Sequence, residues 1–148
     1  MSVKTIFKDC KIVTAGTYAT GTADVKLPTT GVDTKGYDVA EFVLHLATIA
    51  AGAVTTAKVQ QSDDTTDGNF SDLEGTSQTI ADDDDNGVKI FTIVKPTKRY
   101  LRLYVDKDAS NAVGASALCY LHGAEIKPVT QASDVAGELH VTPAEGTA

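Results

Sequence analysis

The sequence predicts an all-β protein, namely an antiparallel β-sandwich or jelly roll with extended N- and C-terminal arms. Short segments with alternating apolar and polar residues recur, Gly- and Asp-rich turn signals separate them, and few stretches have a persuasive helical pattern. The 148 residues suffice for about one domain, and 42% of them are apolar, which is typical of a globular chain. We assign residues 1–128 to one sandwich domain, in which 1–20 can form an arm, and 129–148 to an extended or flexible tail. A small closed barrel is the alternative architecture.

Residues 1–36 are expected to form short strands joined by turns, because Thr and Gly alternate with apolar pairs such as Ile6 and Phe7. No helix of useful length fits this stretch. Pro28 disfavours central pairing at its own position, because its nitrogen cannot donate to a neighbouring strand.

Residues 37–51 fit either a strand or a helix. As a strand, the segment places Phe42, Leu44 and Leu46 on one face. As a helix, it would begin with Asp38 as the N-cap and align its apolar residues along one side. We predict a long strand, because the segments before and after it have strand patterns.

Strand patterns continue through the second half of the chain. Residues 88–94 have the clearest strand signal, because β-branched and aromatic side chains are enriched there. Only a short connection around Pro96 separates them from a strand at 99–105, so we expect these two strands to pair with each other. The other expected elements are a strand at 54–61, a long loop at 62–86 with a short strand near 78–80, a turn at 106–111 and a strand at 113–126.

Charge and hydropathy exclude two classes of partner. Thirteen Lys and Arg against 20 Asp and Glu give a net charge of −7, which repels a phosphate backbone, so we expect no nucleic acid partner. No run of 18 apolar residues occurs, so we expect no membrane partner. The first residues lack the apolar core of a secretory signal, which predicts synthesis and folding in a cytoplasm.

Catalytic and metal-binding patterns are not evident. Cys10 and Cys119 are too few and too far apart for a disulfide framework, and we expect two buried thiols. His45, His122 and His140 have no partners at metal-ligand spacing. There is no nucleophile elbow, phosphate loop or dinucleotide fingerprint. We therefore expect a protein that is not an enzyme and that has no cofactor.

Two acidic groups are candidate binding or catalytic sites. The run 82–87, Asp-Asp-Asp-Asp-Asn-Gly, partly fits a calcium loop, but Ile93 stands where the closing Glu should be. A solvated acidic turn is the favoured interpretation, and a looser surface calcium site stays open. Asp63, Asp64 and Asp67 lie within one stretch, without the fixed separation of a glycosidase pair, and they predict a turn.

Two sets of residues are candidates for a protein interface. On a strand, Arg102 shares a face with Tyr100 and Tyr104, and Tyr and Arg are enriched at interfaces. A solvated outer face with cation–π packing explains this trio equally well. The second set consists of apolar residues in the two arms, which a partner can cover: Phe7, Ile12, Leu139 and Val141.

Three phrases of the sequence carry a family resemblance. They are Val-Gln-Gln-Ser-Asp-Asp at 59–64, Asp-Gly-Asn-Phe-Ser-Asp at 67–72 and Lys-Arg-Tyr-Leu-Arg-Leu at 98–103. In the spacing of the predicted strands and the order of these segments, roughly residues 30–126 resemble the jelly-roll capsid cement, or decoration, proteins of tailed bacteriophages. The resemblance is to the type on the Bordetella phage head. The resemblance also agrees with a strand at 37–51.

The resemblance implies a non-enzymatic virion structural protein on the outer capsid surface. Its partners would be the major capsid protein and further copies of itself, as a homodimer or homotrimer, and it would cement neighbouring capsomers. The net charge of −7 suits an outward-facing position better than contact with packaged DNA. A receptor- or glycan-binding β-sandwich of a phage tail or adhesin is the alternative function.

Overall fold

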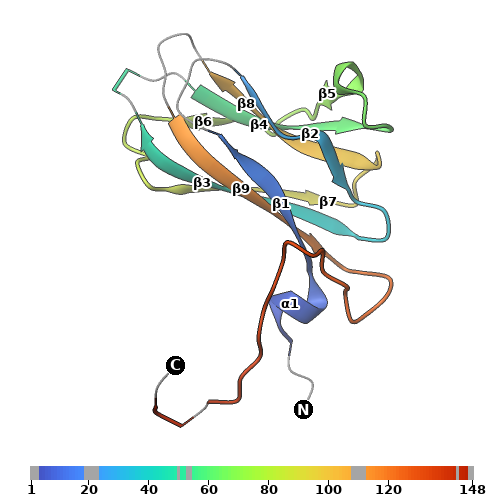
Figure 1. The fold of residues 1–148 in the computed structure, drawn as a ribbon. Helices are drawn as coiled ribbons and strands as arrows, with labels where there is room; N and C mark the ends of the chain where they lie inside the picture. Colours follow the sequence, from blue (N-terminus) through green and yellow to red (C-terminus); the bar gives the residue numbers. More distant parts are fainter. Residues whose placement is uncertain are drawn as a thin grey trace.

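The computed structural model describes residues 4–18, 24–49, 51–52, 55–107, 113–142 and 144–146. In this part of the chain, two antiparallel sheets pack against each other (Figure 1), which confirms the predicted β-sandwich. None of the helices described there is long and apolar enough to cross a membrane.

Sheet A has the strand order β1-β9-β3-β7, and sheet B has the order β2-β8-β4-β5, with β6 also paired to β4. All of these pairings are antiparallel. The strands of sheet A are β1 (Lys11–Tyr18), β3 (Val39–Ile49), β7 (Val88–Val94) and β9 (Val113–His122). Those of sheet B are β2 (Val25–Asp33), β4 (Thr55–Ser62), β5 (Ser71–Asp72), β6 (Gln78–Ile80) and β8 (Tyr100–Lys107).

The core lies between the two sheets, and every second residue of a strand points into it. Phe42, Leu44 and Leu46 of β3 have no exposed surface, so the strand prediction for 37–51 is confirmed and the helical alternative is wrong. Leu101 and Leu103 of β8 meet them from sheet B and are also fully buried. Burial of each such side chain contributes about 1.5 to 3 kcal/mol.

The predicted pairing of 88–94 with 99–105 is wrong. β7 lies in sheet A beside β3, whereas β8 lies in sheet B between β2 and β4. The backbone amide of Lys95 donates to the carbonyl of Asp38, and the amide of Thr34 donates to the carbonyl of Arg99. Residues 95–99 therefore cross from one sheet to the other, a distance of about 10 Å that five residues easily span.

Two short elements were not predicted from the sequence. A single helical turn, α1 (Ile6–Asp9), precedes β1, where no helix was expected. The Thr5 hydroxyl accepts from the Lys8 amide at 3.3 Å, and an Asp9 carboxylate oxygen accepts from the Thr5 amide at 2.7 Å. These two bonds satisfy amides at the start of the turn. The long loop at 62–86 contains the predicted β6 but also β5 and a 3₁₀ turn, η1 (Asp67–Asn69).

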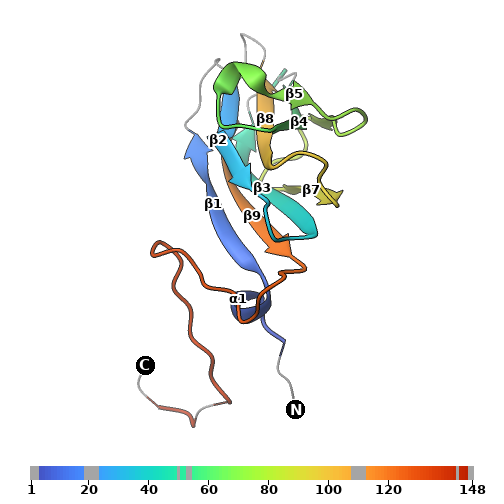
Figure 2. The ribbon, with the colours of Figure 1, turned by 90° about the vertical axis from the view of Figure 1, so that its right-hand side faces the viewer.

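The chain after Pro128 packs beside α1 before it leaves the sandwich. The Gln131 amide nitrogen donates to the carbonyls of Phe7 at 2.8 Å and Cys10 at 2.6 Å, and its oxygen accepts from the Ile12 amide at 2.9 Å. Beyond this anchor the described residues of 136–146 are exposed, and Figure 1 shows them running away from the sheets. Helix α1 and the described part of the tail lie at the same end of the sandwich (Figure 1 and Figure 2), so a single partner at that end could contact both.

Candidate functional site

The acidic run at 82–85 forms hydrogen bonds with the backbone at the end of β3 and just after it. Carboxylate oxygens of Asp85 and Asp82 accept from the amides of Ile49 at 2.6 Å and Gly52 at 2.7 Å. Asp84 binds the Ala81 amide at 2.8 Å and the Lys89 ammonium at 2.8 Å. The predicted acidic turn is present, with Asp82, Asp83 and Asp85 exposed to solvent, and three of its four carboxylates also bind the chain itself. Among the described residues, no group of three or more His, Cys, Asp or Glu side chains is arranged to hold a metal ion.

Cys10, His122 and Glu41 form a line that superficially matches a nucleophilic triad. The Cys10 sulfur lies 3.0 Å from His122 Nδ1, and His122 Nε2 lies 3.9 Å from a Glu41 oxygen. Burial and the nearby Asp9 raise the pKa of the Cys10 thiol, whereas a nucleophilic cysteine needs a lowered pKa. Burial also raises the pKa of Cys119, to about 12. The geometry thus favours two neutral thiols, and both are buried and free.

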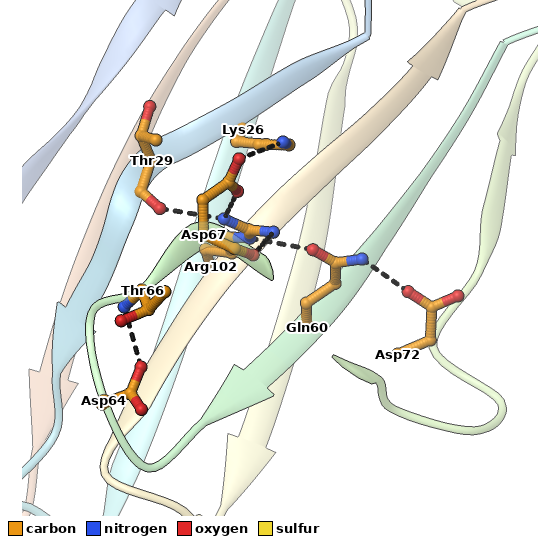
Figure 3. Close-up of polar contacts among 8 residues, drawn as sticks. All are labelled: Lys26, Thr29, Gln60, Asp64, Thr66, Asp67, Asp72 and Arg102. Atoms are coloured by element: carbon orange, nitrogen blue, oxygen red, sulfur yellow. Dashed lines mark hydrogen bonds and ion pairs between the residues drawn. The ribbon is translucent and has the colours of Figure 1, made fainter. Parts of the chain in front are cut away.

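Arg102 lies in a covered polar cluster on the outer side of sheet B (Figure 3). Its side chain is 3% exposed, and Nη1 donates to Asp67 Oδ1 at 2.6 Å and to the Thr29 carbonyl at 2.9 Å. Nε donates to Gln60 Oε1 at 2.8 Å, and the guanidinium lies 3.9 Å from the centre of the Phe70 ring. The loop that carries η1 folds over the sheet and buries this arginine.

Further ion pairs extend the cluster along the surface. Lys26 binds the other oxygen of Asp67 at 2.7 Å. The Gln60 amide donates to Asp72 at 2.7 Å, and Asp72 also pairs with Lys58 at 2.7 Å. Each charge thus has an intramolecular partner, which indicates that the cluster fixes the loop onto sheet B.

These ion pairs predict loss of stability in acid. A hydrogen bond from Arg99 lowers the pKa of Asp33, and a hydrogen bond from Lys58 lowers that of Asp72. A carboxyl whose folded pKa is lowered stabilises the protein above its unfolded pKa of about 3.9, and this stabilisation is lost as the pH falls through the folded pKa. We expect a nearly constant melting temperature from about pH 7 to 5 and a decline below about pH 4.

Calorimetry across this pH range checks the prediction. Asp72→Asn is the informative control, because it removes one carboxyl whose pKa is lowered in the folded state. The melting temperature of this variant should therefore fall less on acidification than that of the unmodified chain. A melting temperature that rises between about pH 5 and 3 would contradict the sign of the linkage.

Tyr100 and Tyr104, the other members of the predicted trio, are half-buried beside Arg102. The Tyr104 hydroxyl donates to Asp24 at 2.6 Å, which raises the pKa of Tyr104 to about 12. Lys58 lies 5.1 Å from the Tyr104 ring centre, and Arg99 lies 5.2 Å from that of Tyr100. The cation–π packing of the second interpretation is thus present, but Arg102 is buried and not solvated, and the role of the trio at an interface stays a prediction.

The predicted arm residues differ in accessibility. Phe7 is half-buried and its ring lies against Gly137, while Ile12 is half-buried on β1. Leu139 is 52% exposed and Val141 is 95% exposed. The two tail residues are therefore the most exposed members of this set, and the role of all four residues at an interface stays a prediction.

The outward side of sheet A, which we call the sheet A face, carries several exposed or half-exposed apolar side chains. Its residues alternate with the core residues, and Val43 of β3 lies between Ile90 of β7 and Leu118 of β9. Ile90 is 52% exposed and Leu118 is 36% exposed, although both are large and apolar. The apolar members are Ile12, Val39, Val43, Val88, Ile90, Val94, Leu118 and Tyr120.

The sheet A face carries little charge. Its described polar members are Thr14, Glu41, His45, Thr92, Ser116 and His122. Glu41 is the one carboxylate among them, and none is Lys or Arg. Sheet B presents Lys26, Lys58, Arg102 and Asp72 on its outer side instead. A contiguous exposed apolar surface rimmed by polar residues marks an interaction site, so the sheet A face is the candidate interface.

The sequence contained a signal for this face that the prediction did not use. Residues 88–94 are apolar at Val88, Ile90 and Val94 as well as at Phe91 and Ile93. A strand that is apolar on both faces is expected to be covered on both sides. Because β7 packs on the core with one side only, its other side lacks a cover within the described chain.

Two solved structures with low sequence identity are similar to this chain. No protein-family model matches the chain, and no curated protein matches it. A protein of Bacillus endospore appendages, a novel family of disulfide-linked pili, has 14% identity and a TM-score of 0.46, with 84% of this chain and 98% of that chain covered. A chain of infectious bursal disease virus, strain Gx, has 15% identity and a TM-score of 0.40, with 80% of this chain and 34% of that longer chain covered.

Proposed function

We propose that the chain is a non-enzymatic structural protein of a tailed-phage head. It binds the outer surface of the assembled capsid through the major capsid protein and cements neighbouring capsomers. The sheet A face carries the proposal, because it is a broad apolar surface with Glu41 as its one carboxylate. The family resemblance of residues 30–126 supplies the identity of the partner.

The dimensions of the sheet A face suit one side of a protein interface. Four strands at about 4.8 Å spacing and about seven residues in length project an area of roughly 440 Å². Each side of a standard interface buries about 800 Å². The exposed tail residues Leu139 and Val141 would supply part of the difference. Face and arm together therefore approach the area that one partner contributes to a standard interface.

Binding to the assembled shell alone is enough to stabilise it. A ligand at about 100 times its dissociation constant stabilises the bound state by about 2.7 kcal/mol per site. Repetition over a symmetric shell multiplies this effect, so modest affinity resists internal pressure. Such a role needs surface and copy number, and it requires no catalytic group.

A binding experiment with shells that lack the protein tests the proposal. We expect saturable binding of the purified chain to expanded heads and a higher temperature of head disruption, since the ligand stabilises the state it binds. Heads already saturated with the protein are the control and should gain nothing. Failure to bind the expanded heads, together with specific hits on a glycan array, would favour the alternative of a glycan-binding sandwich.

A further inference from the structure

No strand of the described chain pairs with the outer edge of β7, and the hydrogen bonds at the two ends of this strand fix which residues face outward. Leu46 donates to the Gly87 carbonyl, and Lys95 donates to the Asp38 carbonyl. In an antiparallel pair, alternate residues exchange hydrogen bonds, so residues 87, 89, 91, 93 and 95 face β3. The backbone groups of Val88, Ile90, Thr92 and Val94 therefore point away from the sheet.

The other long edges of the two sheets have features that oppose strand addition. The β1 edge has a bulge near Gly16, and Gln131 of the tail already binds the Ile12 amide. The β2 edge is interrupted by Pro28 and by a register shift between Leu27 and Val32. Proteins protect exposed edges by such bulges, prolines and covering segments. Of the outward-facing residues of β7, none is Pro, Gly or charged.

We propose that a second copy of this chain covers this edge by pairing its own β7 antiparallel to the first. Pairing along the whole strand places the two-fold axis at Phe91, so that residue numbers opposite each other add up to 182. Val88 then lies opposite Val94 of the second copy, and Ile90 lies opposite Thr92. The two-fold axis repeats each of these pairs, which gives four pairs in all. Each pair exchanges two hydrogen bonds, so the interface has about eight, a number typical of a specific interface.

The side chains of β7 are self-complementary in this register. Each outward-facing pair joins two β-branched residues on the sheet A face, and such cross-strand pairs stabilise antiparallel sheets. Lys89, the charged residue within the strand, lies opposite Ile93 of the second copy. No two like charges are therefore opposed within β7.

Charges beyond the strand ends also favour a second copy. Antiparallel pairing brings the end of β7, which is followed by Lys95 and Lys98, next to the start of the second β7. That start follows the acidic run at 82–85. Segments of opposite charge thus lie near each other at both ends of the paired strands, which favours the antiparallel orientation, although Lys98 and the Asp residues also have partners in their own chain.

One side-chain contact already occupies this edge, and a partner strand would have to replace it. The Gln78 amide nitrogen of β6 donates to the Ile90 carbonyl at 2.8 Å. A groove of about 200 Å³ lies beside the edge, and its lining includes Gly75, Thr76, Gln78, Ile90 and Thr92. In the dimer, the Thr92 amide of the second copy takes the place of the Gln78 amide. The pairing does not depend on the capsid role, because it uses backbone groups that the sheet A face does not need.

Site-directed cross-linking tests the register. Val88→Cys and Val94→Cys are prepared separately and then mixed under mild oxidation. The paired Cα atoms lie about 5.5 Å apart, which suits a disulfide, whereas the two copies of residue 88 lie about 20 Å apart. We expect a covalent dimer in the mixture and none with either variant alone. Absence of the cross-link in the mixture would overturn the register.

Thr92→Pro tests the edge itself, with Thr92→Val as the matched control. Both variants lose the hydrogen bond from the Thr92 hydroxyl to Glu41. Only proline also removes the backbone N–H that points away from the sheet. Neither variant loses a backbone hydrogen bond to β3, because the backbone of residue 92 faces outward. Sedimentation should show a dimer for the unmodified chain and the valine variant, and at least tenfold weaker dimerisation for the proline variant. A chain that stays monomeric at high concentration would overturn the proposal, and so would a trimer with unchanged affinity in Thr92→Pro.

Discussion

Replacing Arg102 with alanine is expected to destabilise the fold by about 3 kcal/mol. The substitution removes donors from Asp67, Gln60 and the Thr29 carbonyl at once, and it opens a void above the Phe70 ring. Gln60 is 8% exposed, so its oxygen would stay buried without its donor. The shift in the midpoint of urea unfolding at pH 7 measures the effect.

Arg99→Ala is the matched control for this measurement. Arg99 donates to both carboxylate oxygens of Asp33, at 3.0 and 2.7 Å, but its side chain is 47% exposed. Exposed ion pairs contribute about 0 to 1 kcal/mol, so Arg99→Ala should shift the midpoint much less than Arg102→Ala. Equal shifts for the two variants would show that the cover over Arg102 does not contribute to stability.

The strands could be predicted because the alternation of apolar and polar residues is visible within each short segment. Which strands lie side by side in a sheet could not be predicted in this way. The period of two identified Phe42, Leu44 and Leu46 as one buried face, and the structure confirms it. The chain between β7 and β8 is short enough for a hairpin but also long enough to cross the core. The backbone hydrogen bonds from Lys95 to Asp38 and from Thr34 to Arg99 hold residues 95–99 in the crossing. Each of these bonds joins residues that are far apart in sequence.

The outer face of sheet B was misjudged for a related reason. The strand pattern correctly places Tyr100, Arg102 and Tyr104 on one side of β8, but it does not show what lies above them. The loop after β4 folds back, and Asp67 and Phe70 cover Arg102. Burial on an outer face depends on such long-range contacts, which a local pattern does not contain.

A charge placed at the centre of the sheet A face should abolish capsid binding. In Leu118→Glu, binding would require burial of an unpaired carboxylate among Val43, Ile90 and the partner surface. Changes at the centre of an interface cost about 2 to 4 kcal/mol, so we expect roughly 30- to 1000-fold weaker binding to expanded heads. Leu118 is 36% exposed and points outward, so the melting temperature should change little. Saturation binding to heads that lack the protein measures the loss.

Thr79→Glu is the control, because it adds the same charge at an exposed position of sheet B. It should bind heads like the unmodified chain, which separates a local effect at the face from a general effect of net charge. A chain without residues 138–148 isolates the contribution of Leu139 and Val141, which is expected to be smaller than that of Leu118. If Leu118→Glu binds normally while the shortened chain does not, the tail is the capsid contact, and the apolar sheet A face then has another partner.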